Sequence, residues 1–476
     1  MENEKIRTTG YTGSAPGQDR WAGFVDFFVV LTIFHSMGFP GTYTEIFGES
    51  IYYLIDYSLF AMEIVVMVLT SASDPRNVKL VDLKKQYWTI YLFVFVVFLE
   101  SVLVADSFSS QFIRCLHFSV TVFYAIWLEE RYDIENLIRI FADAQVLITF
   151  FCIFMIVLRP EIAFVSNYGS QIRYFAGIFK VKNECGSEIS FGIIILLLHL
   201  KMSRWKKRTV SVKYLICLVI DIAFFALTRA AGSIITTLIV SFFIFHCKEK
   251  DDGNHRLSLG VLYIIVSILF LVVVFTILPV FTPLFHAIGK SATLSGRTVL
   301  WRRLLTVILQ HNTMTGWGYF NFWRQKDSIA LVHSVFPQNS WYRTMDTGAH
   351  NDIFELWVNT GLIGISLYFL ILLYAFRDMK RLTNEEYLLC GSIMILETIH
   401  GLTERTFTIF SFQTQMLFIV LAVACSAMWR ERKVLKVYQK KVGEYEYAFD
   451  RYSGHDSHRP GAVCPPPAGM DQIRRR

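Results

Sequence analysis

Charged residues are scarce in this chain. Asp, Glu, Lys and Arg together make up 18% of its 476 residues, whereas they make up about 25% of an ordinary soluble domain. Hydrophobic residues make up 54%, and apolar runs of about 20 residues, long enough to cross a bilayer as helices, recur along the whole length. The composition excludes an ordinary soluble protein and predicts an all-α protein that spans the membrane many times.

Clustered metal ligands are also absent from the sequence. The 8 cysteines are scattered, with no Cys-x-x-Cys motif and no Cys/His cluster, so they support neither a disulfide framework nor a zinc site. In the expected water-facing loops, Asp327, Asp346 and Asp352 are isolated and do not form an acidic pair. We therefore expect no metal and no other cofactor.

A cleavable signal peptide is missing as well. The first apolar run follows a polar start, is interrupted by Asp26 and His35, and lacks a small-residue cleavage site, so we interpret it as a retained span. The net charge of +7 could suggest nucleic acid, but the basic residues collect in short loops between spans. We expect a lipid bilayer around this protein and no nucleic-acid partner.

The apolar runs predict about twelve transmembrane helices. Lys and Arg follow the second, sixth, eighth and tenth of them and the last. By the positive-inside rule, that side of the cell membrane is cytoplasmic, and both termini lie on it. The predicted spans are near 22–39, 51–71, 86–103, 108–128, 139–158, 188–202, 212–227, 230–246, 258–280, 358–376, 385–399 and 406–428.

This count divides the chain into five parts. A cytoplasmic segment, 1–21, precedes spans one to nine in 22–280. A large extracytoplasmic loop, 281–357, is polar and rich in glycine and aromatic residues, and we expect it to carry the site. Spans ten to twelve follow in 358–428, and a basic cytoplasmic tail occupies 429–476.

Cations on the outer side are exceptions to the positive-inside rule. Arg173 and Lys182 lie in a smaller outer loop, Arg229 in a tight turn, and Arg297 in the large loop. A planar guanidinium makes two charge-assisted hydrogen bonds to a phosphate. Several of them together predict a substrate with a diphosphate at the membrane surface. Snorkelling or salt-bridged arginines are the alternative.

Two features of the large loop suggest further roles. The helical period places Arg297, Trp301 and Ile308 on one face, which predicts an interfacial helix with Ser295 as its N-cap and Trp301 at headgroup depth. His350 follows two small residues, so its imidazole could take a proton from a sugar hydroxyl. Purely structural roles for both are the alternative. Aromatic side chains of the loop would suit stacking on sugars.

Four motifs resemble the O-antigen ligase / O-antigen polymerase (Wzy–WaaL) superfamily, and most closely its exopolysaccharide-polymerase branch. Their order and spacing, over roughly residues 110–430, are more specific than any one of them. In the second motif, Ala230 stands where the family usually has glycine, which leaves the backbone geometry of that turn open. The motifs are Arg-x-x-x-Gly-x-Phe with Lys-Asn-x-x-Gly at 173–186, Thr-Arg-Ala-Ala-Gly at 228–232, Ser-Gly-Arg with Trp301 and Gly-Trp-Gly at 295–318, and His-Asn with Gly-Leu-Ile-Gly at 350–364.

The resemblance implies a helical membrane glycosyltransferase whose active site lies in the outer loop and needs no metal. It places the functional arginines and histidine at Arg229, Arg297 and His350, with Arg173 in a supporting role. Further residues expected to contact the diphosphate or the glycan are Lys182, Asn183, Trp301, Tyr319 and Asn351.

The expected activity is an inverting polymerisation of polyisoprenyl-diphosphate-linked oligosaccharide repeat units into a surface or extracellular polysaccharide. Such lipid-linked glycans would serve as donor and acceptor, and chain-length regulator or flippase proteins are candidate partners. The alternative is an O-antigen ligase type of transfer to another lipid or protein. A flippase or transporter is a third possibility, but its charges should line a path across many spans, whereas here cations gather in the outer loops.

Overall fold

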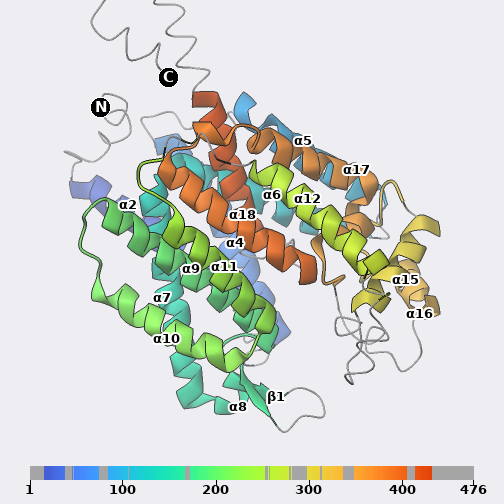
Figure 1. Ribbon diagram of the computed structural model, residues 1–476, viewed down its shortest axis with the longest axis horizontal. Helices are drawn as coiled ribbons and strands as arrows, with labels where there is room; N and C mark the ends of the chain where they lie inside the picture. The colour runs from blue at the N-terminus through green and yellow to red at the C-terminus, as the bar shows by residue number, and fades with distance from the viewer. Residues whose placement is uncertain are drawn as a thin grey trace, which may run out of the picture. The chain divides into compact units, whose positions relative to one another are not determined.

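Long helices make up nearly all of the described chain (Figure 1). The computed structural model describes residues 16–37, 46, 48–73, 84–104, 107–166, 172–251, 253, 256, 258–277, 280, 297–310, 313–335, 348–404 and 413–430. The chain divides into two units, residues 1–428 and residues 429–476.

The long helices follow one another with short connections. In chain order they are α2 (Pro16–Ser36), α4 (Glu49–Ser73), α5 (Trp88–Leu103), α6 (Phe108–Arg131), α7 (Ile134–Leu158), α9 (Lys182–Trp205), α10 (Val212–Thr228), α11 (Ala231–His246), α12 (Leu259–Val272), α17 (Asp352–Ala375), α18 (Asn384–Thr403) and a last helix over 413–430. A π-helical turn, Val273–Ile277, extends α12.

Shorter elements lie between these helices. They are α8 (Pro160–Ala163), the strands β1 (Phe164–Ser166) and β2 (Arg173–Phe175), α15 (Arg297–Gln310), α16 (Lys326–Val335), and 3₁₀ turns at Lys85–Tyr87 and Met379–Arg381. β1 and β2 form an antiparallel hairpin in which Phe164 pairs with Phe175. The Phe175 ring stacks on Phe224 at 4.4 Å, which fixes the hairpin to α10.

Each predicted span overlaps a helix of the described chain. Seven of these helices are long and apolar enough to cross a membrane, namely α4, α5, α6, α7, α9, α12 with its π-helical turn, and α17. Gly23–Ser36 and Ala231–His246 are shorter apolar helices. The chain is therefore a polytopic, mostly helical membrane protein. The total of twelve spans and the extent of the large outer loop stay predictions, since 281–296, 311–312 and 336–347 lie outside the described residues.

Helix α9 lies at the centre of the bundle. It contacts α7, α10, α11 and α18 (Figure 1), and 83% of its apolar window is buried, against 22% for α4 and α12. Small polar residues on α9 permit this close packing, as in the 2.6 Å hydrogen bond between Ser190 and Thr237 of α11. In a membrane such contacts and close shape fit, more than the hydrophobic effect, hold helices together.

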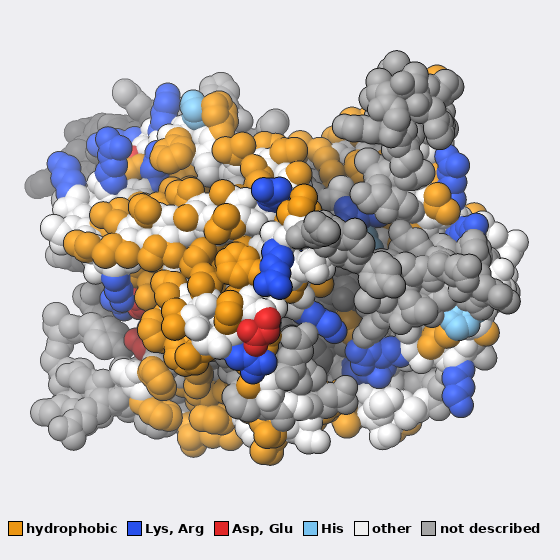
Figure 2. Space-filling view, turned by 90° about the horizontal axis from the view of Figure 1, so that it is seen from below, with side chains coloured by type: hydrophobic (Ala, Val, Ile, Leu, Met, Phe, Trp, Pro, Cys, Tyr) orange, Lys and Arg blue, Asp and Glu red, His pale blue; other side chains and the backbone are white. Residues whose placement is uncertain are grey.

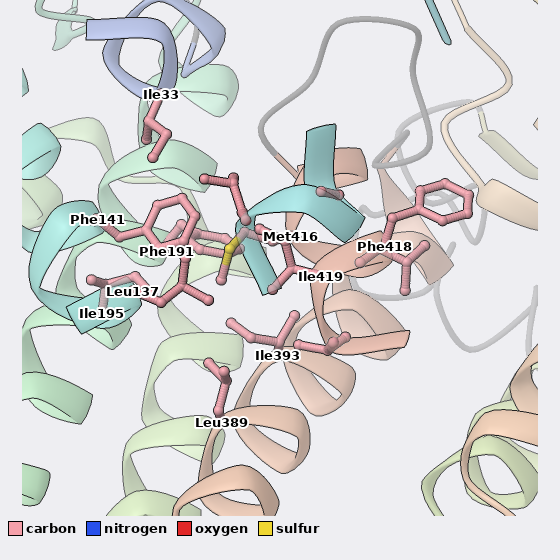
Figure 3. Close-up of a cluster of buried hydrophobic side chains, with 14 of the residues drawn as sticks. Ile33, Leu137, Phe141, Phe191, Ile195, Leu389, Ile393, Met416, Phe418 and Ile419 are labelled. Atoms are coloured by element: carbon pink, nitrogen blue, oxygen red, sulfur yellow. The ribbon is translucent and has the colours of Figure 1, made fainter. Parts of the chain in front are cut away.

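The main apolar core extends through most of the long helices. Figure 3 shows its side chains converging from α2, α7, α9, α18 and the last helix. Phe141, Phe191 and Ile393 are at most 1% exposed there. Since lipid is as apolar as these residues, dispersion between closely packed side chains supplies the attraction. The core fixes the end of α18, and with it the site described next.

Candidate functional site

Glu404 joins two of the residues that the motifs single out. Its Oε1 accepts a hydrogen bond from Nη2 of Arg297 at 2.6 Å, and its Oε2 lies 3.3 Å from Nδ1 of His350. Arg297 is the first residue of α15, His350 shortly precedes α17, and Glu404 directly follows α18. The three side chains are between 18% and 29% exposed, so a ligand can reach them.

The carboxylate of Glu404 sets the tautomer of the neutral His350 ring. Burial by itself raises the pKa of Glu404, but the hydrogen bond from His350 and the positive charge of Arg297 outweigh it and lower this pKa overall. The carboxylate is therefore ionised at neutral pH. With Nδ1–H directed at Glu404, the lone pair of neutral His350 lies on Nε2, which makes no hydrogen bond with the described part of the chain. Nε2 is the nitrogen that can accept a proton.

The backbone at His350 is constrained from both sides. Its φ of 51° lies in the left-handed region, which a non-glycine residue adopts only when its surroundings enforce it. The carbonyl of Ala349 accepts a hydrogen bond from Nε1 of Trp301 at 2.7 Å. The N–H of Ala349 donates to Oε2 of Glu355 at 2.6 Å. The residue before His350 is thus anchored to α15 through Trp301 and to α17 through Glu355.

Glu355 is a buried carboxylate that gathers several donors. It is 1% exposed and lies in the first turn of α17, where the helix dipole favours a negative charge. Besides the Ala349 N–H, it accepts hydrogen bonds from Nε1 of Trp323 and Nδ2 of Asn359, both at 3.1 Å. One side chain therefore ties the His350 loop to the segment around Trp323 and to the middle of α17.

Asn351 holds α17 in place through further hydrogen bonds. Its Oδ1 caps α17 by accepting hydrogen bonds from the N–H groups of Ile353 and Phe354 at 3.0 and 3.1 Å. Its Nδ2 donates to the carbonyl of Leu402 at 3.0 Å. Asn351 is 1% exposed, so the structure gives it a role in fixing α17 to the end of α18.

Two glycine motifs far apart in the sequence meet inside α17. The helix is broken at Gly361, whose φ is 61°. The freed N–H of Leu362 donates to the carbonyl of Thr313 at 3.0 Å. A Cβ on Gly361 would lie 2.0 Å from the Met314 carbonyl oxygen, and one on Gly316 would lie 2.8 Å from the Gly361 nitrogen. Both glycines are needed because the inserted segment and the broken helix touch through their backbones.

Arg229 occupies the turn between α10 and α11 in a left-handed conformation, with φ 50°. Ala230 has φ −82°, which any residue adopts, so alanine is accommodated where the family usually has glycine. Ala230 is closely approached by α9, because a Cβ on Gly186 would lie 2.4 Å from Cβ of Ala230. The Arg229 side chain is exposed and makes no hydrogen bond or ion pair with the described chain.

Further polar groups lie beside this turn. The hairpin places Arg173 next to α10, and Lys182 and Asn183 begin α9. Arg173 and Asn183 are exposed and, like Arg229, have no hydrogen-bond or ion-pair partner in the described chain. The Nζ of Lys182 lies 3.8 Å from the centre of the Tyr174 ring. Because α9 and α11 both begin here, their N-terminal dipoles add to the attraction for an anion.

A chain of contacts links the two groups of residues. Gly186 of α9 packs on Ala230, and the neighbouring Ser187 lies 3.3 Å from Nδ1 of His400. His400 is one turn before Glu404 in α18. Figure 2 shows Lys and Arg side chains gathered on the face that carries α8 and the hairpin, beside an extended hydrophobic surface. The structure thus brings Arg173, Lys182 and Arg229 to the same end of the bundle as Arg297 and His350.

Trp301 and Tyr319 have no surface to offer a sugar. Trp301 is fully buried and stacks on Phe354 at 6.0 Å, in addition to its bond to Ala349. Tyr319 is 1% exposed and packs on Phe118 at 4.5 Å. Both side chains hold the loop in place, and Trp301 lies on the face of α15 that is buried inside the protein. Ser295, the expected N-cap, lies outside the described residues.

Motif reasoning missed the two carboxylates that organise the site. Glu404 lies 54 residues beyond His350, and a carboxylate at the loop-facing end of a predicted span was the available signal. Glu355 is in the first turn of α17, where an acidic residue also reads as a simple helix-dipole feature. In the described part of the chain, no three His, Cys, Asp or Glu side chains are grouped so that they could hold a metal ion.

Comparison with protein families finds one similar family. Residues 214–369, from the start of α10 to the middle of α17, match the O-antigen ligase family. This segment of the chain is similar to O-antigen ligases. The predicted resemblance to the O-antigen ligase/polymerase superfamily is confirmed, and Arg229, Arg297 and His350 all fall within the matched segment.

A curated relative points the same way. The exopolysaccharide production protein ExoQ of Rhizobium meliloti (strain 1021) is 35% identical over 101 residues, which are 21% of this chain and 22% of the relative. The match thus spans about a fifth of the length of that relative. No solved structure matches the chain. Together the family match and the relative support a function of the O-antigen ligase/polymerase type in a membrane protein.

Proposed function

We propose that this protein is an inverting glycosyltransferase of the cell membrane that polymerises polyisoprenyl-diphosphate-linked oligosaccharide repeat units into a surface or extracellular polysaccharide. The loop end of the bundle, where α9 and α11 begin and α18 ends, would face outward. The observation that carries the proposal is the division of charges at this end. Arg229 and Arg173 have no ion-pair partner in the described part of the chain, whereas Arg297 and His350 are bound to one carboxylate.

The unpaired cations suit the leaving group. A diphosphate leaves as an anion, and exposed guanidinium groups can neutralise it as the bond to the sugar breaks. In our proposal Arg229 binds this diphosphate, assisted by Arg173, Lys182 and Asn183. The N–H groups of Arg297 that Glu404 does not engage would bind it from the opposite side.

The paired residues suit the attacking hydroxyl. Nε2 of His350 takes the proton of the acceptor hydroxyl, and Glu404 stabilises the resulting imidazolium through Nδ1–H. The acceptor oxygen forms a bond to the anomeric carbon while the carbon–oxygen bond to the diphosphate breaks. A single displacement of this kind inverts the anomeric centre. The proton later passes from His350 to water.

Two observations favour polymerisation over transfer to a different acceptor. The four motifs resemble the exopolysaccharide-polymerase branch most closely, and the curated relative is named as an exopolysaccharide production protein. A ligase-type transfer to another lipid or protein is the second candidate, and it would use the same charges in the same way. Transport without chemistry is disfavoured, because it gives no role to a half-buried carboxylate that orients a histidine.

The purified protein in nanodiscs, given lipid-linked repeat units of its own host, tests the proposal. A polymerase should produce a ladder of lengthening glycans that remain attached to the polyisoprenyl diphosphate. A ligase should produce a glycan on another lipid or protein and no ladder when lipid-linked repeat units are the sole substrate. Translocation of the lipid-linked unit with no new glycosidic bond would contradict both.

The outward orientation has its own test. Reporter domains fused at Asp252 and at Gln338 should report opposite sides of the membrane, with the Gln338 fusion outside. Equal signals from both fusions would remove the site from the outer surface and the proposed substrate with it.

A further inference from the structure

A second pair of arginines lies beside the proposed site, at the ends of α5 and α6. Arg114 belongs to α6, two turns from its first residue, and is half-buried. Its Nη1 lies 3.4 Å from Oε1 of Gln111 and 3.4 Å from Oδ1 of Asn321, both uncharged oxygens. Around it, Phe112, Ile113 and Leu116 are between 37% and 41% exposed. Arg114 therefore lies at one end of a lipid-facing surface.

The second arginine, Arg324, lies in the segment between α15 and α16. Tyr319 fixes the loop here, because its N–H donates to Oγ of Ser101 and its carbonyl accepts from Nε2 of Gln111, both at 2.7 Å. Arg324 is exposed, and its guanidinium lies 5.4 Å from the centre of the Phe320 ring. Its backbone N–H is bonded to the carbonyl of Asn321 at 2.9 Å. Arg114 and Arg324 thus both contact the turn at residues 320–321.

This turn is mechanically linked to His350. Trp323, next to Arg324, donates to Glu355, and Glu355 holds the N–H of Ala349. His350 is consequently linked through packed side chains to two groups of cations. Arg173, Lys182 and Arg229 are reached through α18 and α9, and Arg114 and Arg324 through Glu355 and Trp323.

We propose that Arg114 and Arg324 bind the diphosphate of the acceptor. The proposal rests on the proposed function, since a polymerase joins two lipid-linked glycans and each brings a diphosphate to the membrane surface. Guanidinium groups match that anion, and the exposed apolar side chains of α6 match the lipid chain below it. The acceptor sugar would then approach His350 from the side opposite the donor.

The test compares two acceptors in detergent free of phospholipid. One is a repeat unit on a short-chain isoprenyl diphosphate, and the other is the same repeat unit as a phosphate-free glycoside. The double variant Arg114→Gln/Arg324→Gln should lower kcat/KM for the diphosphate acceptor by at least about tenfold and leave the glycoside unchanged. Arg302→Gln, an exposed arginine of α15, is the matched control and should affect neither acceptor.

Other results overturn the assignment. An equal fall in kcat/KM with both acceptors would mean that Arg114 and Arg324 support the fold or donor binding. An unchanged kcat/KM with both would mean that these arginines bind no group needed for the reaction. A defect that appears only in nanodiscs containing phosphatidylglycerol, and equally for both acceptors, would identify a phospholipid headgroup as the ligand. If the wild-type protein joins neither acceptor to the donor, the result contradicts the proposed glycosyltransferase function. It is thereby distinguished from a failure of the acceptor site alone.

Discussion

The Arg229 turn and the Glu404 cluster carry the same kinds of side chain in opposite electrostatic states. Arg229 is exposed and without a partner in the described chain. Arg297 is 18% exposed and bonded to Glu404 at 2.6 Å. Arg229 and His350 both have left-handed backbones, so each region holds a strained residue. Within the described chain, however, Arg297 has an ion-pair partner and Arg229 has none.

This difference separates binding from proton transfer. An arginine kept unpaired at the end of a helix costs stability and is best explained by an anion that is absent between turnovers. An arginine and a histidine sharing a carboxylate are already satisfied, so their arrangement serves to orient them. We therefore expect changes at the turn to act on the donor and changes at Glu404 and His350 to act on the acceptor hydroxyl, while Arg297, which also faces the diphosphate, contributes to both.

The largest effect should come from His350→Ala. Loss of the general base should lower turnover by roughly 10²–10⁴, so lipid-linked repeat units accumulate in cells while polymer disappears. Glycan gels and protein abundance in membranes measure both. His246→Ala, at the far end of α11 from the turn, is the control and should retain polymer. Full-length polymer from a normally expressed His350→Ala strain would remove His350 from the mechanism.

Lysine substitutions sharpen the comparison between the arginines. Arg229→Lys keeps the charge but loses the bidentate fork, and we expect kcat/KM for the donor to fall by about 10²–10³. Arg297→Lys can still pair with Glu404, so we expect a comparable loss that appears mainly in kcat. Arg302→Lys should be neutral. Identical kinetic defects in Arg229→Lys and Arg297→Lys would show that the Arg229 turn and the Glu404 cluster do not have separate roles.

Glu404→Gln should have a smaller effect. It keeps the shape but removes the charge that holds Arg297 and His350, and the loss of a charge-assisted hydrogen bond predicts a fall in kcat of about 10- to 100-fold. Glu404→Asp should retain part of the activity that Glu404→Gln loses. Activity equal to wild type in Glu404→Gln would reduce the cluster to a structural contact.

The acid stability of the cluster follows from the same carboxylate. The pKa of Glu404 is lowered from 4.5, so its stabilising contribution is complete above that value and is lost as the pH falls through the lower, folded-state pKa. The cluster should therefore remain assembled between about pH 5 and 8. A loss of activity in that range that persists in Glu404→Gln must arise at another group.

Much of the architecture was readable from the sequence because bilayer thickness forces long apolar runs into helices. Arg229, Arg297 and His350 were found through motifs, and the structure brings them to one end of the bundle. Glu404 could not be found in this way, because only the packing of α18 against α17 brings it to His350.

Aromatic residues show a different limit of prediction from sequence: the residues were identified, but their role was not. Trp301 and Tyr319 were expected to face a substrate, but a large ring in a glycine-rich loop equally suits the loop's own core, and the sequence does not distinguish the two. The insertion of residues 313–317 into the break of α17 was hidden for a related reason. Gly316 and Gly361 each signal a turn or close approach, and nothing in the sequence says that they approach each other.

The smallest expected effect is that of EDTA, which should leave the rate of the purified enzyme unchanged. Two carboxylates of the site are already engaged, Glu404 with Arg297 and His350, and Glu355 with Ala349, Trp323 and Asn359. Neutralisation of the leaving diphosphate then falls to the unpaired cations of the Arg229 turn. Turnover that vanishes in EDTA and returns with Mg²⁺ or Mn²⁺ would mean that a metal performs the task assigned to Arg229. The distinction between the two regions would then fail on the donor side.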